Sequence, residues 1–238
     1  MAKPHPSCPP STFDCACPGL FADRPQTQYW RVCFVKEYRD HYFLKAKQEN
    51  YPARSVYKLK ELDARFHLFR KGMRVLDLGA APGSWSLGAA ERVGPGGLVL
   101  GCDIQDTRTV FPPQVTFMLE DVFDRSAEFE AKLDEIGPFD VVMSDMAPST
   151  TGSKFTDQCR SLELAKEAFA VALARLKPGG SFVVKIFMGP DTQELLLPMR
   201  KAFATVKTFK PKSSRMESKE TFFVGLNLRA DSAAQSQN

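Results

Sequence analysis

The chain has 238 residues, of which 43% are hydrophobic and 25% are charged. This length fits one ordinary domain with short extensions, and the apolar share is large enough to form a hydrophobic core. No stretch approaches the roughly 18 consecutive apolar residues of a membrane span, and the opening sequence MAKPHPSCPP lacks the apolar segment of a secretory signal. The composition therefore predicts a soluble, cytoplasmic protein and argues against a membrane-spanning or secreted one.

The formal net charge of +4 conceals a strong segregation of charge along the chain. Residues 31–74 carry twelve Lys and Arg against five acids (+7), and residues 200–219 carry seven against one (+6). The intervening residues 75–199 carry ten against eighteen (−8). Two basic blocks on either side of an acidic middle are typical of a protein that binds a polyanion, although solvated helix faces would explain them too.

The two ends of the chain lack the apolar periodicity of folded elements. We expect residues 1–33 to be a flexible leader, residues 34–229 to form a single domain and residues 230–238 to be a disordered tail. The six cysteines are scattered, which favours free thiols over a disulfide framework. Three of them crowd the leader near His5 and could bind zinc, but their spacing matches no standard finger, and we predict no metal site.

The domain begins with a basic helical part, residues 34–72, and continues as an α/β core, residues 73–229. In the first part the sequence PARSVYKLKELDARFHLF places apolar side chains at helical spacing and basic side chains on another face. This pattern predicts an amphipathic helix from Pro52 onward that presents a basic edge.

Apolar bursts alternate with helix-like stretches through the core. Strands are expected at 74–79, 96–104, 115–119, 139–146, 181–187, 206–210 and 221–228, and helices near 84–92, 126–136, 158–176 and 192–203. This alternation implies parallel crossovers and a sheet covered on both faces. The loop before the last strand is too short for a helical crossover, so the last two strands are expected to pair antiparallel in a mixed sheet.

The stretch DLGAAPGSWS at 77–86 follows the first core strand, at the sheet edge where doubly wound proteins bind ligands. Gly79 and Gly83 allow the backbone to approach a ligand closely, and Pro82 fixes the turn. The stretch is not G-x-G-x-x-G and has no Walker lysine, which favours a cofactor without phosphates. A tight strand-to-helix turn without a ligand is the alternative.

Acidic residues follow the next three strands: Asp103, Asp121 and Asp145. Asp103 lies where a Rossmann-like unit places the carboxylate that accepts ribose hydroxyls. Asp121 could accept from an adenine amino group, and Asp145 would face a cation near the centre of the sheet. Three carboxylates without a phosphate-binding lysine suit S-adenosylmethionine, although each acid alone could be a turn or cap residue.

Lys185 stands inside SFVVKIF, an otherwise apolar strand. Burying its amine is costly unless the amine is paired or takes part in chemistry, so Lys185 is a candidate catalytic residue, with a structural salt bridge as the alternative. Lys58 projects from the basic edge of the early helix, and Glu220 opens the last strand.

Five motifs then resemble one known family. RSVYKL (54–59), DLGAAPGSWS (77–86), SDMAPSTTG (144–152), GGSFVVKIF (179–187) and SSRMESKETFFV (213–224) are similar to the FtsJ (RrmJ-type) ribosomal RNA 2′-O-methyltransferases, also called ribose methyltransferase E. The similarity runs from about Phe34 to Leu228, with the motifs in the order of the family. One departure is Ser84, where the family usually repeats glycine.

The resemblance implies a Rossmann-like class I methyltransferase fold, S-adenosylmethionine as cofactor and large-subunit ribosomal RNA as substrate, on the assembled or assembling subunit. It places a catalytic tetrad on Lys58, Asp145, Lys185 and Glu220, with Lys185 as the base or steering donor for a ribose hydroxyl. Cofactor contacts are expected from Gly79, Pro82, Gly83, Ser84, Trp85, Asp103, Asp121 and Asp145. The basic blocks predict RNA contacts from Arg54, Lys60, Lys212 and Arg215.

The sequence leaves other functions open. A transfer RNA or messenger RNA cap 2′-O-methyltransferase would use the same tetrad. A nicotinamide-dependent oxidoreductase is opposed by the missing dinucleotide glycine pattern, and an inactive RNA-binding module is opposed by the intact tetrad. We expect no membrane association and no obligate protein partner, with a monomer as the default.

Overall fold

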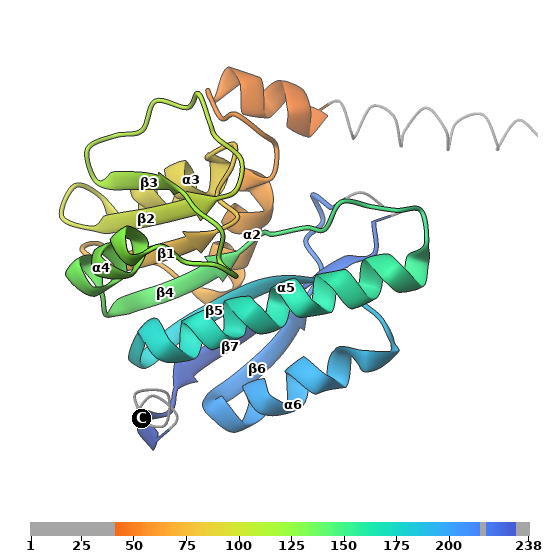
Figure 1. The fold of residues 1–238 in the computed structure, drawn as a ribbon. Coiled ribbons are helices and arrows are strands. Elements are labelled where there is room, and N and C mark those ends of the chain that lie inside the picture. The colour runs from red at the N-terminus through yellow and green to blue at the C-terminus, as the bar shows by residue number, and fades with distance from the viewer. Residues whose placement is uncertain (1–40, 215–217, 232–238) are drawn as a thin grey trace, which may run out of the picture. The chain divides into compact units, whose positions relative to one another are not determined.

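The computed structural model describes residues 41–214 and 218–231, which contain one sheet of seven strands (Figure 1). The strands are β1 (Arg74–Leu78), β2 (Leu98–Asp103), β3 (Val115–Leu119), β4 (Phe139–Ser144), β5 (Leu176–Phe187), β6 (Phe203–Phe209) and β7 (Glu220–Leu228). They lie in the order β3-β2-β1-β4-β5-β7-β6. Strands β1 to β5 are parallel to their neighbours among these five, which confirms the expected α/β core.

The other end of the sheet is antiparallel. Strand β7 lies between β5 and β6 and runs opposite to both, which confirms the expected mixed sheet. Strand β5 begins earlier than expected, at Leu176. The segment 177–180, which lies between the expected helix and the expected strand, is an irregularity within β5: the register to β4 shifts between Phe139 and Val141, and Gly179 has a φ of +80°.

Helices connect the strands. They are α2 (Val56–Phe66), α3 (Ser84–Val93), α4 (Ala127–Ile136), α5 (Lys154–Arg175) and α6 (Gln193–Ala202), and residues 41–48 are also helical. Serine side chains cap two of them: Ser126 accepts from the amide of Phe129, and Ser153 accepts from the amide of Thr156. The cap at Ser153 lets α5 begin several residues before the expected position, close to the loop that follows β4.

The helices cover both faces of the sheet, as the alternation predicted. In Figure 1, α4, α5 and α6 lie in front of the sheet and α3 lies behind it. One buried cluster packs Phe129, Phe169 and Met199 of the front helices against the strands. A second cluster packs Leu62 of α2 and Ala89 of α3 against the other face. Both faces are therefore covered, and the ends of the parallel strands are left as the accessible edge.

Some expectations fall outside the described residues. These are the leader, the end of the tail (232–238), Arg215, and four of the six cysteines. The other two, Cys102 and Cys159, are free thiols, as expected. All described residues belong to one compact unit, Tyr38–Asn238. None of its described helices is both long and apolar enough to cross a bilayer.

Candidate active site

A cavity of about 370 Å³ lies where β1 to β4 end. Residues from the segments after all four strands line it, together with one residue of α5. Four of the lining residues are acids, namely Asp103, Glu120, Asp121 and Asp145, and no described Lys or Arg lines it. The cavity is therefore suited to a cationic or hydroxyl-rich ligand and not to a phosphate group.

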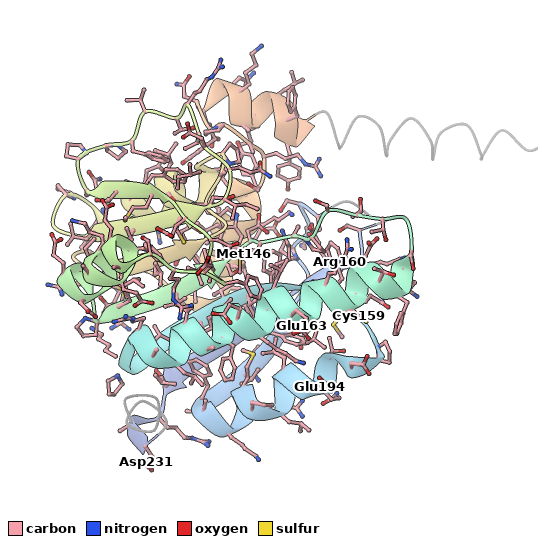
Figure 2. The ribbon with its side chains drawn as sticks, in the orientation of Figure 1. Met146, Cys159, Arg160, Glu163, Glu194 and Asp231 are labelled. Atoms are coloured by element: carbon pink, nitrogen blue, oxygen red, sulfur yellow. The ribbon has the colours of Figure 1, made fainter. Side chains whose placement is uncertain are left out.

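Within the glycine loop, residues 79–83, Gly79 and Ala81 line this cavity, whereas Gly83 does not. Gly79 has a φ of +80°, and a Cβ at this position would lie 2.5 Å from Cγ of Met146. Gly83 has a φ of +105°, and its Cβ would lie 2.8 Å from the ring of Phe111. Figure 2 shows Met146 beside the end of β4, above α5. Glycine is required at both positions because the loop lies directly against its neighbours.

Asp103 holds the glycine loop in place as well as lining the cavity. Its Oδ2 accepts a hydrogen bond from the amide of Ala81 at 3.0 Å, and its Oδ1 accepts one from the amide of Gln105 at 2.9 Å. Asp121 accepts from the amide of Phe123 at 2.9 Å. Each carboxylate oxygen has a second lone pair, so both acids can still accept hydrogen bonds from a ligand.

Three other residues of the DLGAAPGSWS stretch contact the protein itself. The Pro82 carbonyl accepts hydrogen bonds from the hydroxyls of two threonines of the β2–β3 loop. The Ser84 hydroxyl accepts from the amide of Ala53 at 2.7 Å, and Trp85 Nε1 donates to the carbonyl of Ser55 at 3.0 Å. None of the three lines the cavity. The contacts of Ser84 and Trp85 join the start of α3 to the segment before α2.

The four tetrad residues form two ion pairs. Lys58 Nζ lies 2.7 Å from Glu220 Oε1, and both side chains are 12% exposed. Lys185 Nζ lies 2.9 Å from Asp145 Oδ1, outside regular hydrogen-bond geometry, and donates a hydrogen bond to the main-chain carbonyl of Asp145. The residues come from α2, the start of β7, a position near the end of β5 and the residue just after β4. The structure thus brings together residues from both ends of the domain.

The two pairs are close enough to influence each other. Burial raises the pKa of the Glu220 carboxyl, but Lys58, the Ser214 hydroxyl and Lys185 outweigh this effect and hold the pKa below its usual range. Glu220 therefore stays ionised. Such a buried cluster can orient a hydroxyl group and handle its proton.

Three of the expected RNA contacts, all except Arg215, are described and lie near α2. Arg54 is half-buried just before this helix. Lys60 is exposed on it, 3.0 Å from a carboxylate oxygen of Glu49 and 4.4 Å from the centre of the Tyr51 ring. The Lys212 amide donates to a carboxylate on the same helix. The two basic blocks thus contact each other beside the Lys58–Glu220 pair.

Asp77 is an acid of this region that the sequence analysis did not single out. It is fully buried in β1, and one of its oxygens accepts a hydrogen bond from the Ser86 hydroxyl at 2.7 Å. Burial raises its pKa from 3.8 to about 7; the Ser86 hydroxyl opposes this rise, and the charges of Asp145 and Asp103 add to it. A charge inside an apolar strand, the signal that singled out Lys185, would have identified Asp77 too.

Comparisons with known proteins identify the family of this chain. The family described as FtsJ-like methyltransferase matches residues 51–228. The ribosomal RNA large subunit methyltransferase E of Nitratidesulfovibrio vulgaris (strain DP4) is 73% identical over 195 residues, which are 82% of this chain and 96% of that protein. The protein of the same name from Lawsonia intracellularis (strain PHE/MN1-00) is 61% identical over 195 residues, 82% of this chain and 98% of its own.

Solved structures share the fold. A crystal structure from Plasmodium falciparum, provisionally described as a ribosomal RNA methyltransferase, has a TM-score of 0.66 at 29% identity and covers 75% of this chain and 98% of its own. The fibrillarin/Nop5p complex has a TM-score of 0.51 at 19% identity, covers 72% of this chain and 81% of its own, and shows the fold alone. The sheet is that of class I methyltransferases, as the resemblance implied. The family match and the identity of the relatives show that this chain belongs to the FtsJ-like methyltransferase family.

Proposed function

We propose that this enzyme transfers a methyl group from S-adenosylmethionine to a ribose 2′-hydroxyl of large-subunit ribosomal RNA, on the assembled or assembling subunit. The position of Asp145 carries this proposal, because this residue both lines the cavity and pairs with Lys185. A methyl donor in the cavity and a hydroxyl at the tetrad would therefore meet beside one carboxylate. The names of the relatives support the choice of RNA.

The cavity fits S-adenosylmethionine by its charge and by its apolar surface. Its acids suit the positive charge of the cofactor, and Gly79 brings the backbone to its wall. We assign Asp103 to the ribose hydroxyls and Asp121 to the adenine amino group. Ile104 and Phe123, which are 68% and 56% exposed, give an apolar surface for the base. When bound, the cofactor supplies an activated methyl group on a sulfonium.

The tetrad is assigned to the ribose hydroxyl. Lys185 accepts or steers the proton of the hydroxyl, and Asp145 orients the Lys185 amine through its carboxylate and its carbonyl. Glu220 holds Lys58 at the other side of the site. The positioning of the hydroxyl supplies a large part of the rate, because it replaces an encounter in solution by a fixed arrangement.

The basic surface is assigned to the RNA backbone. Arg54, Lys60 and Lys212 lie near α2, and Arg215, outside the described residues, follows Lys212 closely in the sequence. Contacts to phosphate would position the RNA without reading its bases. Ribosomal RNA as partner implies that the enzyme works in the cytoplasm.

The direct test is single-turnover transfer from labelled S-adenosylmethionine to large ribosomal subunits from cells that lack this protein. We expect the label to enter ribosomal RNA and to make one linkage resistant to alkaline cleavage, because a methylated 2′-oxygen cannot attack the neighbouring phosphate. Transfer RNA and capped RNA serve as competing substrates. Faster labelling of either one, or calorimetric binding of NAD in place of S-adenosylmethionine, would overturn the proposal.

A further inference from the structure

Glu61 connects α2 to the turn that follows β6. It lies three residues after Lys58, and its two carboxylate oxygens accept hydrogen bonds from the amides of Lys212 at 2.7 Å and Ser213 at 2.8 Å. We call residues 210–214 the β6–β7 turn. Two amide bonds to one carboxylate fix both the distance and the orientation of this turn relative to α2.

The next residue of the turn is Ser214, which is only 8% exposed. Its amide donates to the carbonyl of Pro211 at 3.1 Å. Its hydroxyl lies close enough to Glu220 to help lower the pKa of that carboxyl, but it has no hydrogen-bond partner of regular geometry among the described residues. A buried hydroxyl without a regular partner is uncommon and calls for a physical reason. The reason is the carboxylate of Glu220, which lies beside the Ser214 hydroxyl and is favoured by it in its charged form.

Helix α2 therefore reaches Glu220 by two routes. Lys58 contacts the carboxylate directly at 2.7 Å. Glu61, one helical turn further along, holds the β6–β7 turn and with it Ser214. Residues three apart on a helix lie on the same side, so both contacts come from one face of α2.

We propose that Glu61 is a positioning residue of the active site: it holds the β6–β7 turn so that the Ser214 hydroxyl lies beside the Glu220 carboxylate and helps to fix the Lys58–Glu220 pair. This inference rests on the proposed function, because its effect is read in methyl transfer. Glu61 touches neither the cavity nor the tetrad residues in the described contacts, so its role is to place Ser214.

The first test compares Glu61→Gln with Glu135→Gln in single-turnover transfer to large subunits. Glutamine can accept at only one atom, and its amide group would oppose the second amide of the turn. We expect the Glu61→Gln rate to fall by about tenfold to a hundredfold, the range of one charge-assisted hydrogen bond. Glu135 is 66% exposed on α4 and pairs with Lys132, so its variant removes the same charge away from the site and should keep the wild-type rate.

Two readouts separate positioning from a merely structural role. Affinity for S-adenosylmethionine should be unchanged, since no residue of α2 or of the β6–β7 turn lines the cavity. The acid limb of the pH–rate profile should move to higher pH, because Glu220 loses the Ser214 hydroxyl that helps to lower its pKa. The charged groups that face Glu220, namely Lys58 and Lys185, remain in the variant.

A second pair of variants keeps the inference testable if Glu61→Gln folds poorly. Ser214→Ala should reproduce the shift of the acid limb, and Ser213→Ala, which removes the neighbouring buried hydroxyl, should not. An unchanged acid limb in both Glu61→Gln and Ser214→Ala would overturn the inference, even if the melting temperature fell. Wild-type enzyme that labels no large subunits would instead overturn the proposed function, and the inference with it.

Discussion

Lys58 of α2 and Glu220 of β7 form an ion pair of 2.7 Å in which each side chain is only 12% exposed. The pair joins the basic helical part of the domain to the last strand of the sheet. Its energy depends on both partners, because removal of one leaves the other as a poorly compensated buried charge. The two residues are therefore expected to act as one unit.

A double-mutant cycle tests this unit. Lys58→Met and Glu220→Gln should each lower the single-turnover rate, by less than a change at Lys185 does, and the double variant should cost little more than the worse single one. We expect a coupling free energy of about 0.5 to 3 kcal/mol, as for residues in direct contact. Strictly additive losses would show that the pair does not act together.

Asp103 should govern cofactor affinity. Asp103→Ala should weaken the binding of S-adenosylmethionine by about 1 to 3 kcal/mol, because it removes charge-assisted hydrogen bonds to the ribose. It also removes the hydrogen bond from the Ala81 amide that holds the glycine loop. Titration calorimetry measures this loss. Asp106→Ala is the matched control, since Asp106 contacts only the amide of Thr107 among the described hydrogen bonds and does not line the cavity. Equal affinities for the two variants would refute the assignment.

The basic surface near α2 should bind RNA through phosphates. Charge reversal at Arg54, Lys60 or Lys212 should weaken RNA binding and reduce the slope of log affinity against log salt by roughly 0.7 for each lost contact to single-stranded phosphate. Affinity for S-adenosylmethionine should hardly change. If RNA affinity responded neither to salt nor to these reversals, the basic side chains would be exposed to solvent without contacting RNA.

Asp77 should make the folded state less stable as the pH rises. Its pKa is raised from 3.8 to about 7 in the folded protein, so the folded state binds the proton more tightly than the unfolded chain does. The free energy of unfolding should therefore fall between about pH 4 and pH 7. Asp77→Asn removes this contribution and should gain stability over the wild type as the pH rises through this window. Denaturant unfolding at several pH values measures it, and a constant difference between the two proteins would contradict the assignment.

Much of the fold could be predicted from the sequence because parallel strands buried on both faces are continuous apolar runs. The antiparallel end followed from the short segment before β7. The irregularity in β5 could not be predicted, because the sequence KPGG is typical of a turn. Only the register to β4 shows that the strand continues through this segment.

The members of the tetrad were expected, but the pairing of Lys58 with Glu220 depends on where α2 packs, which no local pattern determines. The contacts of Ser84 and Trp85 could not be predicted from the sequence either. Their place in the glycine-rich stretch predicted contact with a cofactor, whereas the structure directs both side chains toward the segment before α2. The sequence located the loop, but the directions of its side chains are set by tertiary packing.

In the proposed function Lys185 acts on the ribose hydroxyl, and the Lys185→Met variant is the sharpest test of this role. Methionine keeps the buried stem of the side chain and removes its charge, so the melting temperature and the affinity for S-adenosylmethionine serve as controls for folding. The measurement is single-turnover transfer from labelled S-adenosylmethionine to large ribosomal subunits, with RNA and cofactor saturating. We expect the rate to fall by a factor of at least about 10² to 10⁴, the usual contribution of a positioned proton acceptor. A Lys185→Met enzyme within about tenfold of the wild-type rate would contradict this role, because Lys185 would then serve only to pair with Asp145.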